Sequence, residues 1–258
     1  MNDSPSIAPE ESGASSEWQN NLQHLLYIRD LCVDYNKSLG SRSSDISGIW
    51  SASLFLRSIA TLNAVIVLLK FRLNDDAAII IRTMFEIELQ LDAIKEQPEL
   101  ATQLVQRTEA HRRNRLEALT GSKREMPEGI TRDAMAEQIA KINAEGVPAD
   151  VKKVQLAKKA GLLYEFQTLY SLLSDIAHVS PMGLAHYLEK DATTGKLRLN
   201  PNGSLLSPEY LIGLAGATQL NILDLVVSIL GDVPPPKAEE LRKLNRAILH
   251  RIKTKARI

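Results

Sequence analysis

The feature that most constrains the fold is the helical spacing of apolar residues, which runs through most of the chain. From residue 17 to residue 39, apolar side chains recur every three or four positions, with acidic and amide groups between them. An apolar stripe at this period lets a helix bury one side. The ranges with this pattern are 17–39, 44–72, 76–96, 98–120, 131–144, 149–160, 162–178 and 208–230, followed by a basic helix within 237–258. The sequence therefore predicts an all-α fold, a bundle of about seven to nine helices.

One segment, residues 187–200, departs from helical spacing. In its sequence, YLEKDATTGKLRLN, Thr194-Gly195 supplies a turn and the next four residues alternate between polar and apolar. This pattern is typical of two short strands joined by a turn. We therefore expect one small β-hairpin inserted in the helical chain.

The division of the chain follows from its breaks and its charges. Pro234-Pro235-Pro236 interrupts any helix, and the first 20 residues carry acidic groups without a basic one. We expect a disordered acidic tail over 1–16, one helical domain over 17–232 with a charged helical excursion at 98–160, and a proline break with a basic C-terminal helix over 233–258.

Composition narrows the classes of function. The chain has 258 residues, 44% of them apolar, and its formal net charge is zero. This charge implies no overall attraction to nucleic acid or to a membrane surface. The single cysteine, Cys32, excludes an intramolecular disulfide and a cysteine-based metal cluster. With no signal-peptide pattern at the N-terminus, we expect a cytoplasmic protein.

Two apolar stretches of the sequence are candidates for membrane spans. Residues 58–71 are too few to cross a bilayer. Residues 211–230 are numerous enough, but they include Gln219, Asn221 and Asp224, and a carboxylate near the centre of a bilayer is costly. We therefore expect both to be core helices, with no membrane partner.

The helix expected over 77–94, AAIIIRTMFEIELQLDAI, carries polar groups inside an apolar sequence. Its apolar residues point in every direction around the axis, which is typical of a helix buried on most sides. Arg82, Glu86 and Gln90 follow each other at four-residue spacing and share one stripe. A buried arginine needs a partner, and Glu86 lies one turn away. The pair is interpreted either as an internal salt bridge or as part of a binding site.

A second polar line ends the helix expected over 162–178. Tyr170, Ser174 and His178 lie at four-residue spacing, and Asp175 precedes the histidine by three. A helix end favours polar groups and a protonated histidine. Because both polar lines adjoin apolar faces, we expect the two helices to pack together, with Arg82 or Glu86 within hydrogen-bond reach of Ser174 or His178. Binding is thus predicted for Arg82, Glu86, Tyr170, Ser174, Asp175 and His178.

The sequence gives little support for serine nucleophile catalysis, metal binding or base stacking with RNA. No oxyanion-hole pattern or strand-turn-helix elbow accompanies Ser174. His178 and His186 lack zinc-site spacing, so we expect no metal and no cofactor. The basic segment 107–124 has the charge to contact phosphates but no aromatic residues for base stacking.

The polar motifs have a family resemblance. The Arg82-x-x-x-Glu86 helix, followed by the Tyr-x-x-x-Ser-x-x-x-His line that ends at His178, resembles an uncharacterised bacterial helical family over roughly residues 45–230. This resemblance implies an all-helical fold and by itself no activity.

More distantly, the arrangement resembles the helical bundles of higher-eukaryote-and-prokaryote nucleotide-binding (HEPN) domains. Many of these are metal-independent ribonucleases of toxin and phage-defence systems, with an arginine and a histidine four to six residues apart on one helix. In this chain, three residues separate Arg107 from His111 and Arg246 from His250.

Two hypotheses of different classes follow. In the first, the protein is a non-enzymatic module that binds an unknown protein or small ligand, and Arg82, Glu86, Ser174 and His178 form a polar lock in the core. In the second, the same four groups are catalytic in a ribonuclease, where His178 transfers protons and Arg82 stabilises phosphate charge. RNA is the partner in the second hypothesis, and a homo-oligomer is compatible with both.

Overall fold

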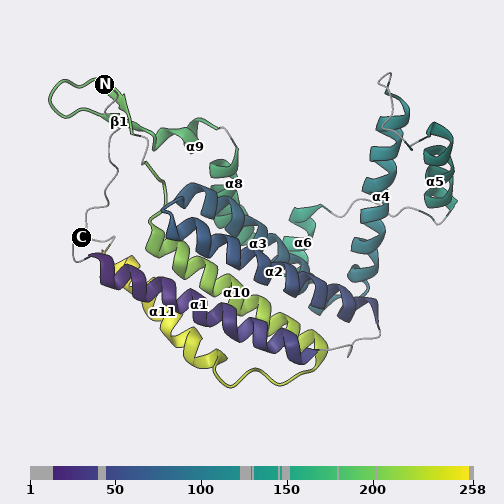
Figure 1. The fold of residues 1–258 in the computed structure, drawn as a ribbon, viewed down its shortest axis with the longest axis horizontal. Coiled ribbons are helices and arrows are strands. Elements are labelled where there is room, and N and C mark those ends of the chain that lie inside the picture. Colours follow the sequence, from purple (N-terminus) through teal and green to yellow (C-terminus); the bar gives the residue numbers. More distant parts are fainter. Residues whose placement is uncertain are drawn as a thin grey trace.

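The computed structural model describes residues 14–39, 45–122, 129, 131–144, 146, 152–178, 180–200 and 203–255. Within these ranges the secondary structure is helical apart from one antiparallel two-stranded hairpin. This confirms the all-α bundle with a small β-hairpin (Figure 1). Residues 1–13 of the predicted acidic tail lie outside the described residues, and residues 14–16 belong to the first helix.

The element bounds are close to those expected from the sequence. The long helices are α1 (Ala14–Leu39), α2 (Ile46–Lys70), α3 (Asn74–Glu96), α4 (Leu100–Thr120), α5 (Arg132–Ala144), α10 (Pro208–Leu230) and α11 (Ala238–Lys255). The short elements are α6 (Lys153–Lys159), α7 (Leu163–Glu165), the π-helix η1 (Phe166–Tyr170), α8 (Ser171–Ala177), α9 (Pro181–Ala185), β1 (Leu188–Lys190) and β2 (Leu197–Leu199).

Helix α10 is the centre of the bundle. It packs against α1, α2, α3 and α11, and most of its residues are buried. Two glycines let α11 approach closely, because a Cβ at Gly213 or Gly216 would collide with side chains of α11. At the same contact, Asn245 donates a hydrogen bond from Nδ2 to the Gly213 carbonyl oxygen at 2.9 Å. The apolar content of α10 thus serves the core of the bundle.

Local sequence signals set several helix ends. The carboxylate of Asp45 accepts a hydrogen bond from the Gly48 amide and caps α2. Ser207 caps α10 ahead of Pro208, and Gly231 ends that helix with a φ of 67°. The N-cap of α3 is Leu73, and no side chain caps this helix.

Helices α4 and α5 form a hairpin that projects from the bundle, on the right of Figure 1. Only the first turns of α4 contribute to the core, through Leu100, Ala101 and Leu104. Helix α6 belongs to the expected charged excursion but packs back against α3. This return brings Lys153 of α6 to Glu86 in the polar stripe of α3.

The helix expected as one piece over 162–178 comprises three elements. The π-helix Phe166–Tyr170 separates α7 from α8, and α8 ends at Ala177. His178 follows with an extended backbone, φ −102° and ψ 147°. Ser180-Pro181 then starts α9, where the Ser180 hydroxyl accepts a hydrogen bond from the Gly183 amide.

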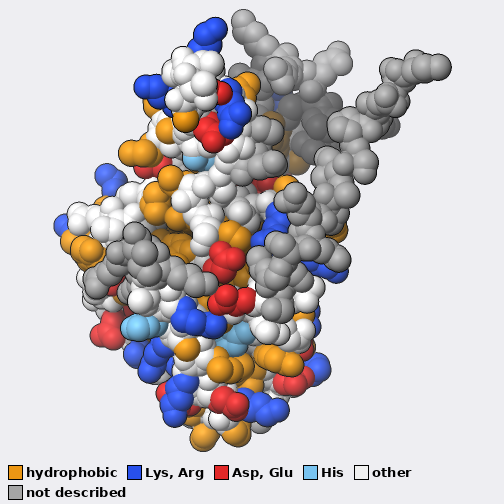
Figure 2. Space-filling model, turned by 90° about the vertical axis from the view of Figure 1, so that its left-hand side faces the viewer, with side chains coloured by type: hydrophobic (Ala, Val, Ile, Leu, Met, Phe, Trp, Pro, Cys, Tyr) orange, Lys and Arg blue, Asp and Glu red, His pale blue; other side chains and the backbone are white. Residues whose placement is uncertain are grey.

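Helices α2 and α10 are both long and apolar enough, by length and composition, to cross a membrane. Helix α10 is enclosed by its neighbours, whereas α2 exposes Ile49, Leu56 and Val67 on one side. The absence of a membrane partner therefore stays a prediction. On the face at the left of Figure 1, described acidic and basic side chains are interspersed, and neither sign dominates (Figure 2).

Candidate functional site

Three side chains from two helices, Arg82 and Glu86 of α3 and Lys153 of α6, converge on the hydroxyl of Tyr170. Arg82 Nη2 donates to Tyr170 Oη at 2.9 Å, and Lys153 Nζ donates to the same oxygen at 3.1 Å. The hydroxyl in turn donates to Glu86 Oε1 at 2.9 Å, and that oxygen also accepts from Lys153 Nζ at 2.6 Å. We call Arg82, Glu86, Lys153 and Tyr170 the tyrosine cluster. It joins α3, α6 and η1 by hydrogen bonds that involve charged groups, which are the stronger kind.

Aromatic side chains hold the tyrosine in place. The Phe166 ring stacks on the Tyr170 ring with centroids 4.6 Å apart, and Phe85 of α3 packs beside it at 6.3 Å. The Arg82 guanidinium carbon lies 5.0 Å from the centroid of the tyrosine ring, within cation–π range. The π-helical turn contains both stacked rings, and single π turns in helices are frequent at functional sites.

The tyrosine cluster has one positive charge in excess, because Arg82 and Lys153 share the carboxylate of Glu86. Arg82 Nε lies 3.5 Å from Glu86 Oε1, which is an ion pair without a hydrogen bond at that nitrogen. Burial lowers the pKa of Lys153, but its hydrogen bonds to Glu86 and Tyr170 outweigh this and leave the pKa above its ordinary value. Lys153 is therefore charged at neutral pH.

The tyrosine cluster is shielded from solvent at Tyr170 and accessible to solvent at Lys153. Tyr170 is 8% exposed, while the Lys153 side chain is 40% exposed. The Arg82 and Glu86 side chains lie between these values, at 19% and 25%. A group arriving from solvent would therefore meet the lysine first and the arginine behind it.

The expected contact of Arg82 or Glu86 with Ser174 or His178 is wrong in detail. Helices α3 and α8 pack together as expected, but the polar stripe of α3 meets Tyr170. Among the described residues, no hydrogen bond reaches the side chains of Ser174, Asp175 or His178; the Ser180 hydroxyl donates only to the backbone carbonyl of Asp175, at 3.3 Å. His178 is exposed because the helix has already ended at Ala177, so its side chain leaves the line that helical spacing predicts.

Lys153 was missed from the sequence because nothing in a polar helix of several lysines marks one of them as a partner of α3. Glu88 was missed as well. It is 7% exposed, and its Oε1 accepts a hydrogen bond from Asn221 Nδ2 of α10 at 2.8 Å. The available signal was an acid between Ile87 and Leu89 in a helix buried on most sides.

A third polar group ties the hairpin segment to the start of α3. Asp75 Oδ2 contacts His186 Nε2 at 2.6 Å and accepts from the Tyr187 hydroxyl at 2.7 Å, while Oδ1 accepts from Ser204 at 2.9 Å. The hydrogen bond to Asp75, followed by burial, raises the pKa of Tyr187 to about 12. These contacts hold His186, Tyr187 and Ser204 against the start of α3.

Two other candidates from the sequence are a metal site and the pair Arg107 and His111. Within the described ranges, no three metal-ligating side chains gather around one point. Arg107 Nε and His111 Nε2 are 3.2 Å apart on the exposed side of α4 and are not part of the tyrosine cluster.

Comparison with known proteins places the chain in a family. No curated protein and no solved structure matches it. The model of a family of unknown function, DUF5677, matches residues 48–196. This range runs from α2 into the turn of the hairpin and contains all four residues of the tyrosine cluster. The chain thus belongs to the family of unknown function DUF5677.

Proposed function

We propose that the protein is a binding module whose tyrosine cluster takes an anionic group, a phosphate or a carboxylate, of a small ligand or partner. The observation that carries this proposal is the convergence of Arg82 and Lys153 on one hydroxyl, with a single carboxylate to balance them. The cluster opens to solvent at Lys153, whose side chain is 40% exposed.

The geometry suits an oxyanion. Arg82 presents a planar set of donors, and Nε has no hydrogen bond among the described residues. Lys153 carries three donor hydrogens, of which its contacts to Glu86 and Tyr170 use two. An anion beside these groups would gain charge-assisted hydrogen bonds in a partly desolvated place, where they are stronger than in water.

The ribonuclease alternative lacks a supporting contact. Cleavage of RNA without a metal needs a group that transfers protons near neutral pH, and His178 was the candidate. Its exposed side chain has no hydrogen bond to the cluster among the described residues. The binding module is therefore the function that the site supports best.

The proposal is tested by titrating inorganic phosphate and acetate into the purified protein, followed by nuclear magnetic resonance of the labelled arginine and lysine side chains. We expect saturable binding that Lys153→Gln weakens about tenfold, since one full charge is lost from a partly open site. Lys158→Gln is the matched control, because Lys158 is exposed on the same helix outside the cluster. An unchanged affinity in Lys153→Gln, or no saturable binding of either anion, would overturn the proposal.

A second experiment separates binding from cleavage. A short single-stranded RNA is incubated with the protein in the presence of a chelator. Intact RNA is expected. Degradation that disappears in both Arg82→Lys and His178→Ala would replace the binding module with a ribonuclease.

A further inference from the structure

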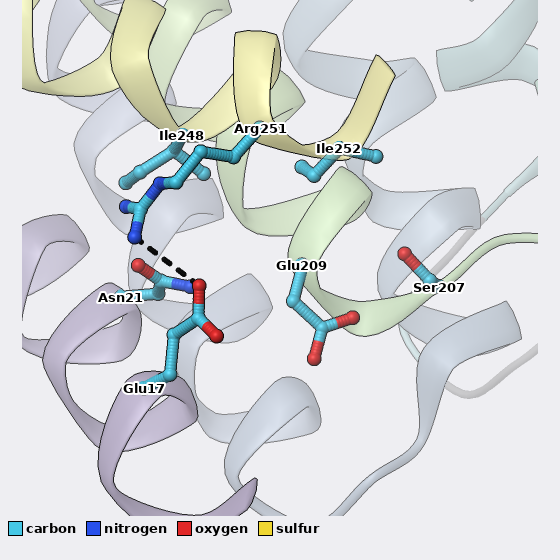
Figure 3. A pocket seen from close by; sticks show the side chains of 7 residues that line it. All are labelled: Glu17, Asn21, Ser207, Glu209, Ile248, Arg251 and Ile252. Carbon is cyan, nitrogen blue, oxygen red and sulfur yellow. Dashed lines mark hydrogen bonds and ion pairs between the residues drawn. The ribbon is translucent and has the colours of Figure 1, made fainter. Parts of the chain in front are cut away.

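A cavity of about 410 Å³ lies where α1, α10 and α11 meet (Figure 3). It is formed by the first turns of α1 and α10 and the last turns of α11. Its lining residues are Glu17, Asn21, Ser207, Glu209, Ile248, Arg251 and Ile252. The volume is within the range of about 300–1,000 Å³ that small-molecule sites occupy. None of these residues lies in the segment that matches the family, residues 48–196.

The wall of this cavity contains an amide that no described residue pairs with. Asn21 is 5% exposed, and its side chain makes no hydrogen bond with any described residue. Its amide nitrogen and oxygen are not fully buried, so they keep contact with solvent. Asn21 therefore offers a donor and an acceptor to whatever enters the cavity.

The charges of the lining leave one carboxylate unbalanced. Arg251 Nη1 donates to Glu17 Oε1 at 3.1 Å, the contact dashed in Figure 3. Glu209 forms no ion pair with a described residue, and its carboxylate is half-buried in the cavity wall. It lies in the first turn of α10. The cavity thus attracts a cation.

The remaining wall is apolar. Ile248 is 5% exposed, and Ile252 lies one turn further along α11 on the same side. Both flank the space above Glu209 in Figure 3. A hydrated inorganic ion would gain nothing from this wall, whereas an alkyl chain would bury apolar surface against it.

We propose that this cavity binds a small organic monocation, a primary ammonium group on an alkyl body. The ammonium donates to the Glu209 carboxylate, the alkyl body packs against Ile248 and Ile252, and Asn21 pairs with a polar group of the ligand. An anion is disfavoured, because Arg251 already faces Glu17 and the further charge of Glu209 would repel it.

Three probes of similar shape and different charge test the proposal: hexylammonium, the neutral hexanol and the anion hexanoate. Binding is measured by calorimetric titration and by the amide side-chain signals of Asn21. We expect hexylammonium to bind with a Kd of about 1 mM or tighter, as fits a ligand of this size. Hexanol and hexanoate are expected to bind at least about tenfold more weakly, since they lack the interaction with a carboxylate.

Two single substitutions test whether hexylammonium binds in this cavity. Glu209→Gln keeps the shape and removes the charge, and we expect it to weaken hexylammonium binding about tenfold. Glu240→Gln is the control, because Glu240 is exposed on α11 outside the cavity. Three results would overturn the proposal: Glu209→Gln binds hexylammonium as tightly as the wild type does, the wild type binds hexanoate more tightly than hexylammonium, or no probe binds saturably. Should Glu209→Gln not fold, the order of the three probes on the wild-type protein still decides.

Discussion

Replacing Glu88 with glutamine is expected to stabilise the protein at neutral and alkaline pH and to leave its stability unchanged in mild acid. The carboxyl of Glu88 is buried between α3 and α10, with one hydrogen bond, from Asn221. Burial raises the pKa of Glu88 from its ordinary 4.5 to about 7, against the opposing effect of that hydrogen bond. The negative charges of Asp92 and Glu165 raise it further.

The magnitude follows from the linkage between proton binding and folding. The folded state holds the Glu88 proton more tightly than the unfolded state, so the stability that this group contributes is complete below pH 4.5 and lost as the pH rises through 7. One pKa unit corresponds to about 1.4 kcal/mol, so the loss through Glu88 is about 3 kcal/mol. Glutamine keeps the acceptor for Asn221 and carries no charge, so the variant avoids this loss.

The assay is urea denaturation of both proteins at about pH 4.5, 6 and 8, followed by circular dichroism, with the free energy of unfolding extrapolated to water. The difference between variant and wild type should be near zero at the lowest pH and grow toward about 3 kcal/mol at the highest. A constant difference at all three pH values, or a variant less stable than the wild type at pH 8, would refute the reasoning.

Three further substitutions test the packing. Gly183→Ala should destabilise the region around α9 by about 2 kcal/mol or more in chemical denaturation, because the new Cβ would collide with the Asp175 carbonyl. Gly121→Ala is the control and should leave the stability unchanged, because its new Cβ would make only ordinary contacts. Phe55→Ala should cost about 3–5 kcal/mol in chemical denaturation, since this ring is fully buried in the main core. Asp75→Asn should weaken the attachment of residues 186–200 to α3 by about 1–3 kcal/mol, because one amide oxygen replaces two carboxylate oxygens that serve three donors. The measurement is limited proteolysis, which should cleave this segment faster while the stability of the bundle is unchanged.

The candidate site was partly within reach of the sequence. Arg82 and Glu86 could be paired from four-residue spacing on one helix, and Tyr170 could be placed on a polar line that borders a core face. The contact of Arg82 and Glu86 with Tyr170 depends on how α3 packs against η1 and α8. His178 could not be placed, because the helix end at Ala177 decides its direction. A shift of one residue at a helix end redirects a side chain.

The sequence by itself determined where the helices and the hairpin lie, because helical spacing, caps and turn residues act between neighbours in the chain. Asp45, Ser207 and Gly231 set helix ends through such local contacts. Only the tertiary structure decided which polar groups meet. Lys153 reaches Glu86 from 67 positions away, and Asn221 reaches Glu88 from 133. A buried charge requires a partner, but many side chains can serve, and the packing of whole helices selects among them.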